Sequence, residues 1–576
     1  MVSGISRRTF KSQQVMRFGS EPRGLSVREM TAALGLSIVL IGSLWVLTAA
    51  SGSVGIARAD DWSYLLTQFE FAESGRFVMN NWAVTMLIGQ TLIAAPIVAF
   101  FGPSVTALQV LVAGLSAAAL VVTYVVVRQA LPAGWSALAV ASLAFSPVFG
   151  PSVVSFMTDI PSLFFLSLSL LLGIQALRGP LVRWYHLWAS GLLALIAFTF
   201  RDYAIIGFPA VIIVGLLLHK DRRTRVVLAA VLAVIGALAL ALYLWRHSLP
   251  NDLRLPGWDL AYSIQLVARG TLTIALLVAP ALAAVTWWRV KAASTGRTVL
   301  LYGTAAGIAA VTLVIAGFEL LGNVIHPFGT SWLVSGSGVR LWPLWINRLI
   351  IVAAFVCLTL LLALAWKIWS GGFGDLGRTA TLMAWIRNGP ARAVVVVFPL
   401  LLLLAHSGAT IVLGTWYIDR YFILVIPFLA AALLRVAIDR RWIARGTQAV
   451  IPCFFLLIFT GVGLHVVDFN ARFDGARWEI GEQLVAQGYQ ASEIDAGVEW
   501  VTFHALDIGQ SPEQREYQPD RNWWTERYPD QSMCVTVSAI DAASVPSEDD
   551  TAVVMVSTLF GREFSLVSRP GPDPCP

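Results

Sequence analysis

Charged residues are scarce in this chain. Asp, Glu, Lys and Arg make up 13% of its 576 residues, whereas soluble proteins average roughly 25%. Hydrophobic residues make up 57%, and the mean hydropathy is +0.73. A soluble multidomain fold is therefore excluded, and the composition predicts a polytopic membrane protein.

Cysteine and histidine are also few, with four and seven residues. No His/Cys cluster with zinc-ligand spacing is present in the sequence, so no cofactor is predicted, and a divalent metal stays open. Cys357 and Cys453 lie in apolar runs, which is typical of small core residues. Cys534 and Cys575 lie in a polar tail, where a disulfide and two free thiols are both compatible with the sequence.

A cleavable signal peptide is not visible either. The stretch SRRTFK resembles a twin-arginine signal, but about twenty polar residues separate it from the next apolar run. We therefore interpret residues 1–30 as a basic cytoplasmic tail.

About thirteen apolar stretches are long enough to cross a bilayer. Lys and Arg gather in alternate loops, which predicts a plasma-membrane protein with a cytoplasmic N-terminus and an extracytoplasmic C-terminus. A further span at residues 84–101 would reverse every later loop against this rule. We expect a helix at the outer interface there, and fourteen spans are the alternative. The predicted spans lie near residues 33–56, 105–127, 133–149, 160–177, 186–200, 204–219, 226–245, 262–285, 299–317, 349–366, 392–409, 422–438 and 447–466.

The chain is predicted to have two folded parts. An all-α transmembrane domain covers residues 31–466 and has its first outer loop at residues 57–104. After residue 466 the long apolar runs give way to an amphipathic segment and several segments of strand composition. Residues 467–576 are therefore expected to form a small extracytoplasmic α/β domain.

Ionisable residues with aromatic neighbours gather on the predicted outer face. Such residues at membrane depth are uncommon and usually functional. Each also has a structural alternative: helix capping for the lone Asp, contact with lipid headgroups for the arginines, and a solvated loop for the acidic pair. Tryptophan and tyrosine are also expected as interface anchors. The candidates are Asp60, Asp61, Trp62 and Tyr64 in ADDWSY, Asp159 in TDIPS, Arg201 in FRDY, and Arg420 and Tyr421 in DRYF.

This set of residues suits the transfer of a group from an anionic lipid. A carboxylate can accept the proton of an acceptor hydroxyl, and a second carboxylate beside it can orient it or raise its pKa. Arginine binds a departing phosphate through paired donors. Aromatic faces suit sugar rings, and a lipid-borne donor would explain a site at the bilayer edge.

The order and sidedness of these motifs resemble the GT-C superfamily of polytopic glycosyltransferases, in particular its protein-mannosyltransferase and aminoarabinose-transferase branch. The resemblance covers roughly residues 30–465. It consists of the acidic pair after the first span, an outer helix ending in FFGPS, TDIPSLFF, FRDYAIIGFP and DRYFILVIPFL. The resemblance implies a polyprenyl-phosphate-linked sugar as donor and inversion of the anomeric centre in one displacement.

The resemblance also implies roles for individual residues. Asp60 matches the catalytic acidic position, with Asp61 as the second candidate, and Asp159 matches the second acidic position. We take Arg201 and Arg420 as candidates for the phosphate. Tyr421, Trp62 and Tyr64 are the aromatic candidates for substrate binding, and a basic residue that the branch often has in its first outer loop is represented by Arg58 or Arg76.

The sequence therefore predicts a membrane glycosyltransferase that acts on an extracytoplasmic glycan, lipid or protein, with no nucleic-acid partner. Mannose, arabinose, an aminopentose and a uronic acid are all compatible with it. A secondary transporter or flippase is one alternative, although such proteins place polar residues near the bilayer midplane. A glycan ligase or polymerase of similar architecture is the other.

Overall fold

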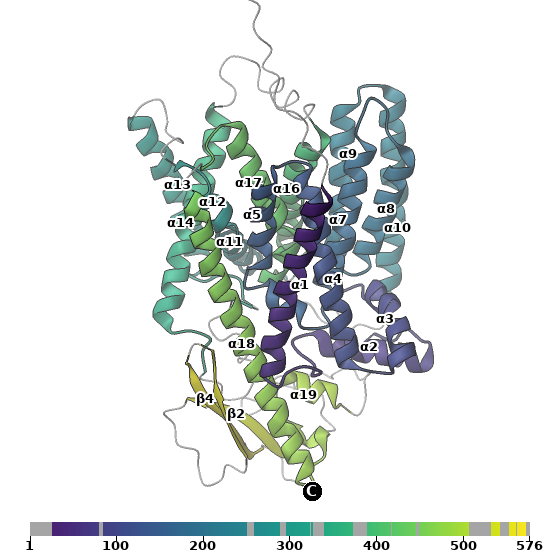
Figure 1. Ribbon diagram of the computed structural model, residues 1–576, viewed down its shortest axis with the longest axis vertical. Coiled ribbons are helices and arrows are strands. Elements are labelled where there is room, and N and C mark those ends of the chain that lie inside the picture. The colour runs from purple at the N-terminus through teal and green to yellow at the C-terminus, as the bar shows by residue number, and fades with distance from the viewer. Residues whose placement is uncertain are drawn as a thin grey trace, which may run out of the picture.

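The computed structural model of the chain is a bundle of helices with a small sheet at one end (Figure 1). This confirms the predicted fold class. The residues described are 26–79, 85–249, 258–287, 295–322, 324–325, 339–371, 389–415, 417–444, 449–505, 532–541, 552–559 and 561–571.

Within these ranges, nine helices are long and apolar enough to cross a membrane. Each contains a long run of apolar residues, so this run satisfies its backbone hydrogen bonds within the helix and can present apolar side chains to lipid. They are α1 (Val27–Ala50), α4 (Val105–Arg128), α7 (Asp159–Ala176), α10 (Arg222–His247), α11 (Leu260–Leu277), α13 (Thr295–Ile315), α14 (Leu344–Gly371), α16 (Pro390–Leu413) and α18 (Val450–Ala486).

Shorter helices lie between these spans or across their ends. Several coincide with stretches that the sequence predicts to cross the membrane, and the number of crossings stays a prediction. They are α3 (Ile88–Phe101), α5 (Ala133–Ala144), α6 (Phe149–Val153), α8 (Trp184–Phe198), α9 (Gly207–Leu218), α12 (Ala279–Ala283) and α17 (Ile426–Asp439).

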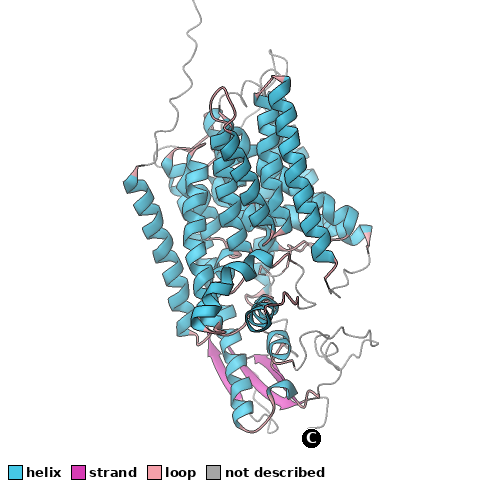
Figure 2. Cartoon of the chain, turned by 90° about the vertical axis from the view of Figure 1, so that its right-hand side faces the viewer, coloured by secondary structure: helices cyan, strands magenta, loops and turns pink. Residues whose placement is uncertain are grey.

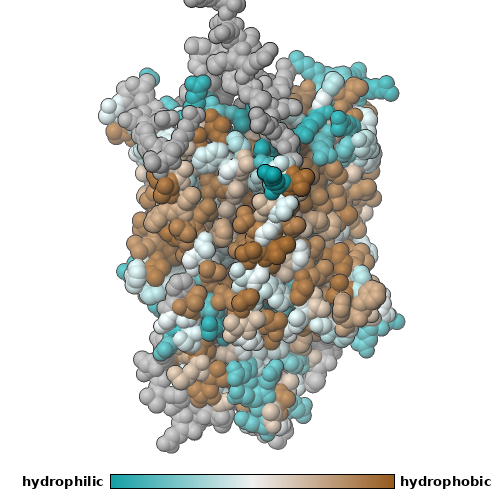
Figure 3. Space-filling view, in the orientation of Figure 1, coloured by the Kyte–Doolittle hydropathy of each residue, from teal (hydrophilic) through white to brown (hydrophobic). Residues whose placement is uncertain are grey.

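The surface of the bundle matches a lipid environment. Val46, Leu404 and Leu457 are each at least 70% exposed. Figure 3 shows a broad hydrophobic band around the middle of the molecule and hydrophilic residues toward both ends. An apolar surface of this extent is not found on soluble monomers, so the band marks the part covered by lipid.

Hydrogen bonds between small polar side chains hold neighbouring helices together. Ser169 on α7 and Ser190 on α8 each donate to the other's backbone carbonyl at 2.8 Å. Thr123 on α4 and Ser167 on α7 are joined at 2.9 Å. Such bonds stabilise helix pairs in lipid, where apolar burial alone favours no particular partner.

Two helices lie across the end of the bundle that faces the sheet. They are α2 (Asp61–Ser74) and α3, both beside the end of α4 (Figure 1). The sequence predicts a helix at the outer interface for residues 84–101, and α3 occupies most of that segment.

The helix α18 joins the bundle to the C-terminal part of the chain. It continues for 37 residues without a break, and its second half extends beyond the bundle toward the sheet (Figure 1). The domain boundary predicted between residues 466 and 467 therefore lies inside this helix. The amphipathic segment expected after residue 470 is the outer half of the same helix.

The sheet packs against that outer half of α18 (Figure 2). Its order is β1-β2-β4-β3, with β1 parallel to β2 and the other neighbours antiparallel. Phe564 contacts Phe469 and Phe473 of α18, with ring centroids 5.6 and 5.8 Å apart. The strands are β1 (Ile494–Asp495), β2 (Val535–Asp541), β3 (Val553–Ser557) and β4 (Glu563–Pro570).

The cysteines differ in state. Cys534, directly before β2, takes part in a disulfide, whereas Cys357 and Cys453 are free. Cys575 lies outside the described residues. A disulfide at Cys534 agrees with an extracytoplasmic position for the sheet, because oxidising compartments permit such bonds.

The close packing of α7 leads to a stability prediction. A Cβ added at Gly173 would lie 2.5 Å from a Val211 side-chain methyl group and 3.0 Å from the Ser190 hydroxyl oxygen. We expect Gly173→Ala to destabilise the protein by about 1–3 kcal/mol through overpacking. The control is Gly114→Ala on α4, where an added Cβ has no neighbour within 4 Å. Thermal unfolding in detergent should show a lower Tm for Gly173→Ala only, and equal Tm values would contradict this account.

Candidate active site

The loop that precedes α2 places Asp60 at the edge of the bundle. Ala59 has a φ of +47°, a left-handed conformation that costs roughly 1 kcal/mol or more for a residue with a Cβ. Asp60 occupies the N-cap position of α2, but its side chain makes no capping hydrogen bond. The carboxylate therefore does not cap α2 and instead interacts with a residue from another part of the chain.

Asp60 forms an ion pair with Arg420. Arg420 belongs to the 3-10 helix η4 (Asp419–Leu424), which is 360 residues away in the sequence. The Arg420 side chain is 4% exposed and that of Asp60 is 24% exposed. The guanidinium is thus buried behind the carboxylate, and Asp60 is the member of the pair that solvent can reach.

Hydrogen bonds to Asp419 fix the start of the 3-10 helix η4, directly before Arg420. Asp419 is fully buried and accepts hydrogen bonds from the backbone N–H groups of Val324 and Ile325, at 2.9 and 2.6 Å. Burial raises the pKa of Asp419 to about 6, although these two donors act in the opposite direction. Asp419 therefore anchors η4 and sets the position from which Arg420 reaches Asp60.

A second ion pair lies close by. Asp159, at the first turn of α7, receives a 2.6 Å hydrogen bond from Arg201, and both side chains are buried. The Tyr203 hydroxyl, in the 3-10 helix η1 (Asp202–Ile206), also donates to Asp159 at 3.3 Å. Neither Asp159 nor Arg201 therefore plays the alternative structural role considered for it, helix capping or contact with lipid headgroups.

Tyr64 lies within electrostatic range of both pairs. Burial raises the pKa of Tyr64 to about 12, and the charges of Arg201, Asp60, Arg420 and Asp159 all act on its hydroxyl. The guanidinium carbon of Arg201 also lies 5.4 Å from the ring centroid of Tyr421. The structure thus brings together six of the residues singled out on the predicted outer loops: Asp60, Tyr64, Asp159, Arg201, Arg420 and Tyr421.

The aromatic candidates differ in exposure. Trp62 and Tyr64 are each 1% exposed, so their ring faces are covered by protein. Tyr421 is half-buried and packs against two half-buried rings that the sequence analysis did not select, Tyr203 and His406. Tyr203 stands two residues after Arg201 and could have been found from that motif. His406 is a lone residue in an apolar span, and no pattern marks it.

Asp61 has a different environment from Asp60. It is fully buried and accepts hydrogen bonds from the backbone N–H groups of Arg58, at 2.5 Å, and Phe156, at 2.9 Å. Burial raises the pKa of Asp61 to about 7, and the two N–H donors act against that shift. Asp61 therefore ties the first outer loop to the segment before α7, and its carboxylate faces backbone rather than an open site.

The two arginines retain unused donors. The Nε atoms of Arg201 and Arg420 are buried and have no hydrogen-bond partner among the described residues. Buried guanidinium groups with spare donors are suited to bind an anion, because phosphate oxygens can accept several hydrogen bonds from them. In the part of the chain that the structure describes, no group of three or more His, Cys, Asp and Glu side chains could hold a metal ion.

Residues 88–245 match a family model described as dolichyl-phosphate-mannose-protein mannosyltransferase. The matched segment contains Asp159 and Arg201, and the match confirms the predicted resemblance to GT-C glycosyltransferases of the mannosyltransferase type. It supports a glycosyltransferase embedded in a membrane. No curated protein gives a significant match to the chain.

Three solved structures are similar to the chain at low identity. ArnT from Cupriavidus metallidurans in the apo state is 15% identical, covering 93% of this chain and 98% of that chain, with a TM-score of 0.37. The same protein bound to undecaprenyl phosphate is 14% identical, covering 94% and 99%, with a TM-score of 0.37. The Archaeoglobus fulgidus oligosaccharyltransferase in complex with Zn and sulfate is 13% identical, covering 88% and 62%, with a TM-score of 0.39.

The buried pair of Asp159 and Arg201 leads to a second stability prediction. Arg201→Met should lower the free energy of unfolding by about 3–5 kcal/mol, because it leaves the Asp159 carboxylate buried without its cation. The double variant Asp159→Asn/Arg201→Met should be more stable than Arg201→Met alone. Chemical denaturation in detergent of both single variants and the double variant measures this coupling. Additive effects would mean that the two side chains do not depend on one another.

Proposed function

We propose that the chain transfers a sugar from a polyprenyl-phosphate-linked donor to an extracytoplasmic acceptor in the cell envelope. The main observation in favour is that two carboxylate–guanidinium pairs, Asp60 with Arg420 and Asp159 with Arg201, lie close enough together for the charges of both to act on Tyr64. The mannosyltransferase family match over residues 88–245 supports the reaction class. A donor with a polyprenyl chain would be dissolved in the membrane, which agrees with a site at the end of a bundle of membrane-spanning helices.

In the proposed reaction Asp60 acts as general base. Its carboxylate takes the proton of an acceptor hydroxyl as that oxygen attacks the anomeric carbon of the donor sugar. The bond from the anomeric carbon to the phosphate oxygen breaks, and polyprenyl phosphate leaves with the bonding electron pair. A single displacement of this kind inverts the anomeric centre.

Arg420 and Arg201 stabilise the departing phosphate in this scheme. The negative charge on phosphate grows as the glycosidic bond breaks, so fixed and buried cations stabilise the transition state more than the ground state. Arg420 contacts Asp60 directly. It therefore holds the base beside the leaving group, and Asp159 holds Arg201 in the same way from α7.

Replacing the proposed base tests this assignment. Asp60→Asn should lower sugar transfer by about 10²–10⁴-fold, because the amide cannot accept the acceptor proton. The measurement is mass spectrometry of envelope glycans in cells whose native copy is deleted and replaced by the variant, with the amount of membrane-inserted protein determined in parallel. Glu73→Gln is the matched control, because Glu73 is an exposed carboxylate on the same helix.

Full transfer by Asp60→Asn would remove Asp60 from the mechanism. Absence of any glycan difference between the deletion strain and wild type would count against the glycosyltransferase itself. Movement of a lipid-linked sugar across sealed vesicles, without transfer, would instead support a flippase.

The proposed sidedness can be tested by cysteine labelling. In a Cys453→Ser background, we expect Ser74→Cys at the end of α2 to react with a membrane-impermeant maleimide on intact cells. Arg223→Cys at the start of α10 should react only after permeabilisation, because basic loops are retained in the cytoplasm. Both replaced residues are exposed. The reverse labelling pattern would place Asp60 on the cytoplasmic side and would overturn the proposal.

A further inference from the structure

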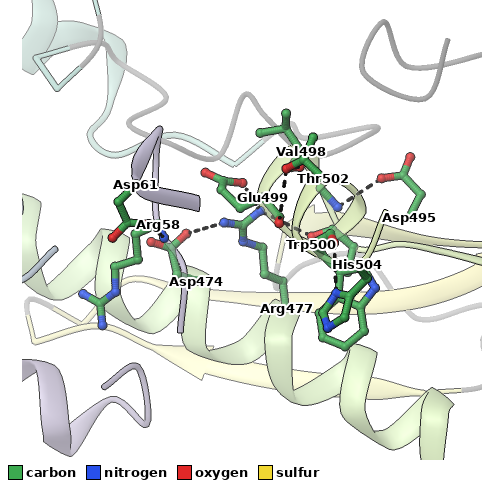
Figure 4. A network of polar contacts seen from close by, with 12 residues as sticks. Arg58, Asp61, Asp474, Arg477, Asp495, Val498, Glu499, Trp500, Thr502 and His504 are labelled. Atoms are coloured by element: carbon green, nitrogen blue, oxygen red, sulfur yellow. Dashed lines mark hydrogen bonds and ion pairs between the residues drawn. The ribbon is translucent and has the colours of Figure 1, made fainter. Parts of the chain in front are cut away.

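A second group of charged residues is buried where the loop before α2 meets α18 and the short helix α19 (Val498–Phe503) (Figure 4). Its members are Arg58 and Asp61, which flank Asp60 in the sequence, Asp474 and Arg477 on α18, and Glu499 on α19. None of these five residues is more than 5% exposed. The proposed chemistry does not use them, although burying so many charges is unfavourable unless they are paired.

Arg477 connects α18 to α19. Its guanidinium donates to Glu499 at 2.5 Å and to Asp474 at 3.1 Å, and also to the backbone carbonyl of Ala496 at 3.3 Å. These three acceptors come from two segments that are separated by the end of α18 and by β1. The contacts therefore fix α19 against the outer half of α18.

The same group reaches the first outer loop through electrostatics. Burial lowers the pKa of Arg58, and the charges of Asp474 and Asp61 act to raise it. The charge of Glu499 in turn acts on Asp61. Figure 4 shows Arg58 and Asp61 on the loop beside Asp474, with Arg477 between Asp474 and Glu499.

Close packing at two glycines also holds α18 against the α1–α2 turn and against α19. A Cβ added at Gly475 of α18 would lie 2.5 Å from the backbone oxygen of Ser51, in the turn that leads to the first outer loop. A Cβ at Gly481 would lie 2.6 Å from the ring of Trp500 on α19. The outer half of α18 is therefore in direct contact with both the α1–α2 turn and α19.

We infer that this group of five residues positions Asp60 for the reaction, so that the C-terminal part of the chain completes the active site. Asp61 holds the loop on one side through the backbone of Arg58 and Phe156, and Arg420 holds the Asp60 carboxylate on the other. Asp474, Arg477 and Glu499, on α18 and α19, hold the loop from the side of the C-terminal part. Arg58, Asp61, Asp474, Arg477 and Glu499 are positioning residues in this account, which rests on the proposed function for the role of Asp60.

The placement of Asp60 can be measured without knowledge of the sugar. In a Cys453→Ser background, Asp60→Cys places a thiol beside Arg420, and its rate of reaction with a charged methanethiosulfonate reagent reports the local geometry. We expect Glu499→Gln to change this rate by about tenfold, because loosening the loop alters both the exposure of the thiol and its distance from Arg420. Gly475→Ala should act in the same direction through packing alone.

Asp468→Asn is the matched control. Asp468 is a buried carboxylate on the same helix that binds Arg472 at 2.7 Å and the backbone N–H of Leu559 at 2.6 Å. It attaches the sheet to α18 and has no hydrogen bond to the described residues of the first outer loop. If the thiol rate reports a general loosening of the C-terminal part, Asp468→Asn should change it as much as Glu499→Gln does. If it reports loss of the positioning contact, Asp468→Asn should leave the rate unchanged.

In the chain that retains Asp60, Glu499→Gln should lower sugar transfer by about tenfold while binding of undecaprenyl phosphate stays unchanged, because misplacement of a reacting group lowers the rate of the chemical step. Equal effects of Glu499→Gln and Asp468→Asn on the thiol rate, or no effect of Glu499→Gln and Gly475→Ala, would overturn the inference. If the thiol rate responds as expected but wild-type cells transfer no sugar, the proposed function fails and the structural coupling stands.

Discussion

At the candidate site the buried charges of Asp159, Arg201 and Arg420 are each met by an opposite charge, and that constraint determines the shape of the site. Transfer of an unpaired carboxylate or guanidinium out of water is prohibitively unfavourable. Asp159 therefore requires Arg201, and Arg420 requires Asp60. Because the partners come from separate helices, each pair also fixes how two distant parts of the bundle approach one another.

The same constraint distinguishes the two adjacent carboxylates. Asp61 is fully buried and satisfied by two backbone N–H groups, so it stabilises the loop. Asp60 keeps 24% of its side-chain surface exposed and faces a guanidinium, which suits a group that must meet a substrate. Adjacent residues of identical chemistry thus have different environments, because α2 begins between them and turns their side chains toward different surroundings.

Much of this arrangement could be predicted from the sequence. Apolar run length predicts a helical membrane bundle, and the motifs identify Asp60, Asp159, Arg201 and Arg420 as candidates. The side of the membrane on which they lie stays a prediction from the placement of Lys and Arg. Their pairing could not be predicted, because it depends on how helices pack across hundreds of residues. The continuity of α18 through residue 466 was also not predicted, since its outer half loses lipid contact and changes composition without changing helical geometry. His406 was missed because one residue creates no pattern.

The long α18 helix gives the C-terminal part of the chain a mechanical role. A flexible linker at the membrane surface would let the sheet move independently, whereas a continuous helix transmits its position to the bundle. Because Gly475 of this helix contacts the turn before Asp60 and Arg477 binds Glu499 on α19, movement of the outer part would move the loop that carries Asp60 as well. If Asp60 is the base, as we propose, the sheet and α19 form part of its support, and an acceptor that contacts them would be placed relative to Asp60 by the same helix.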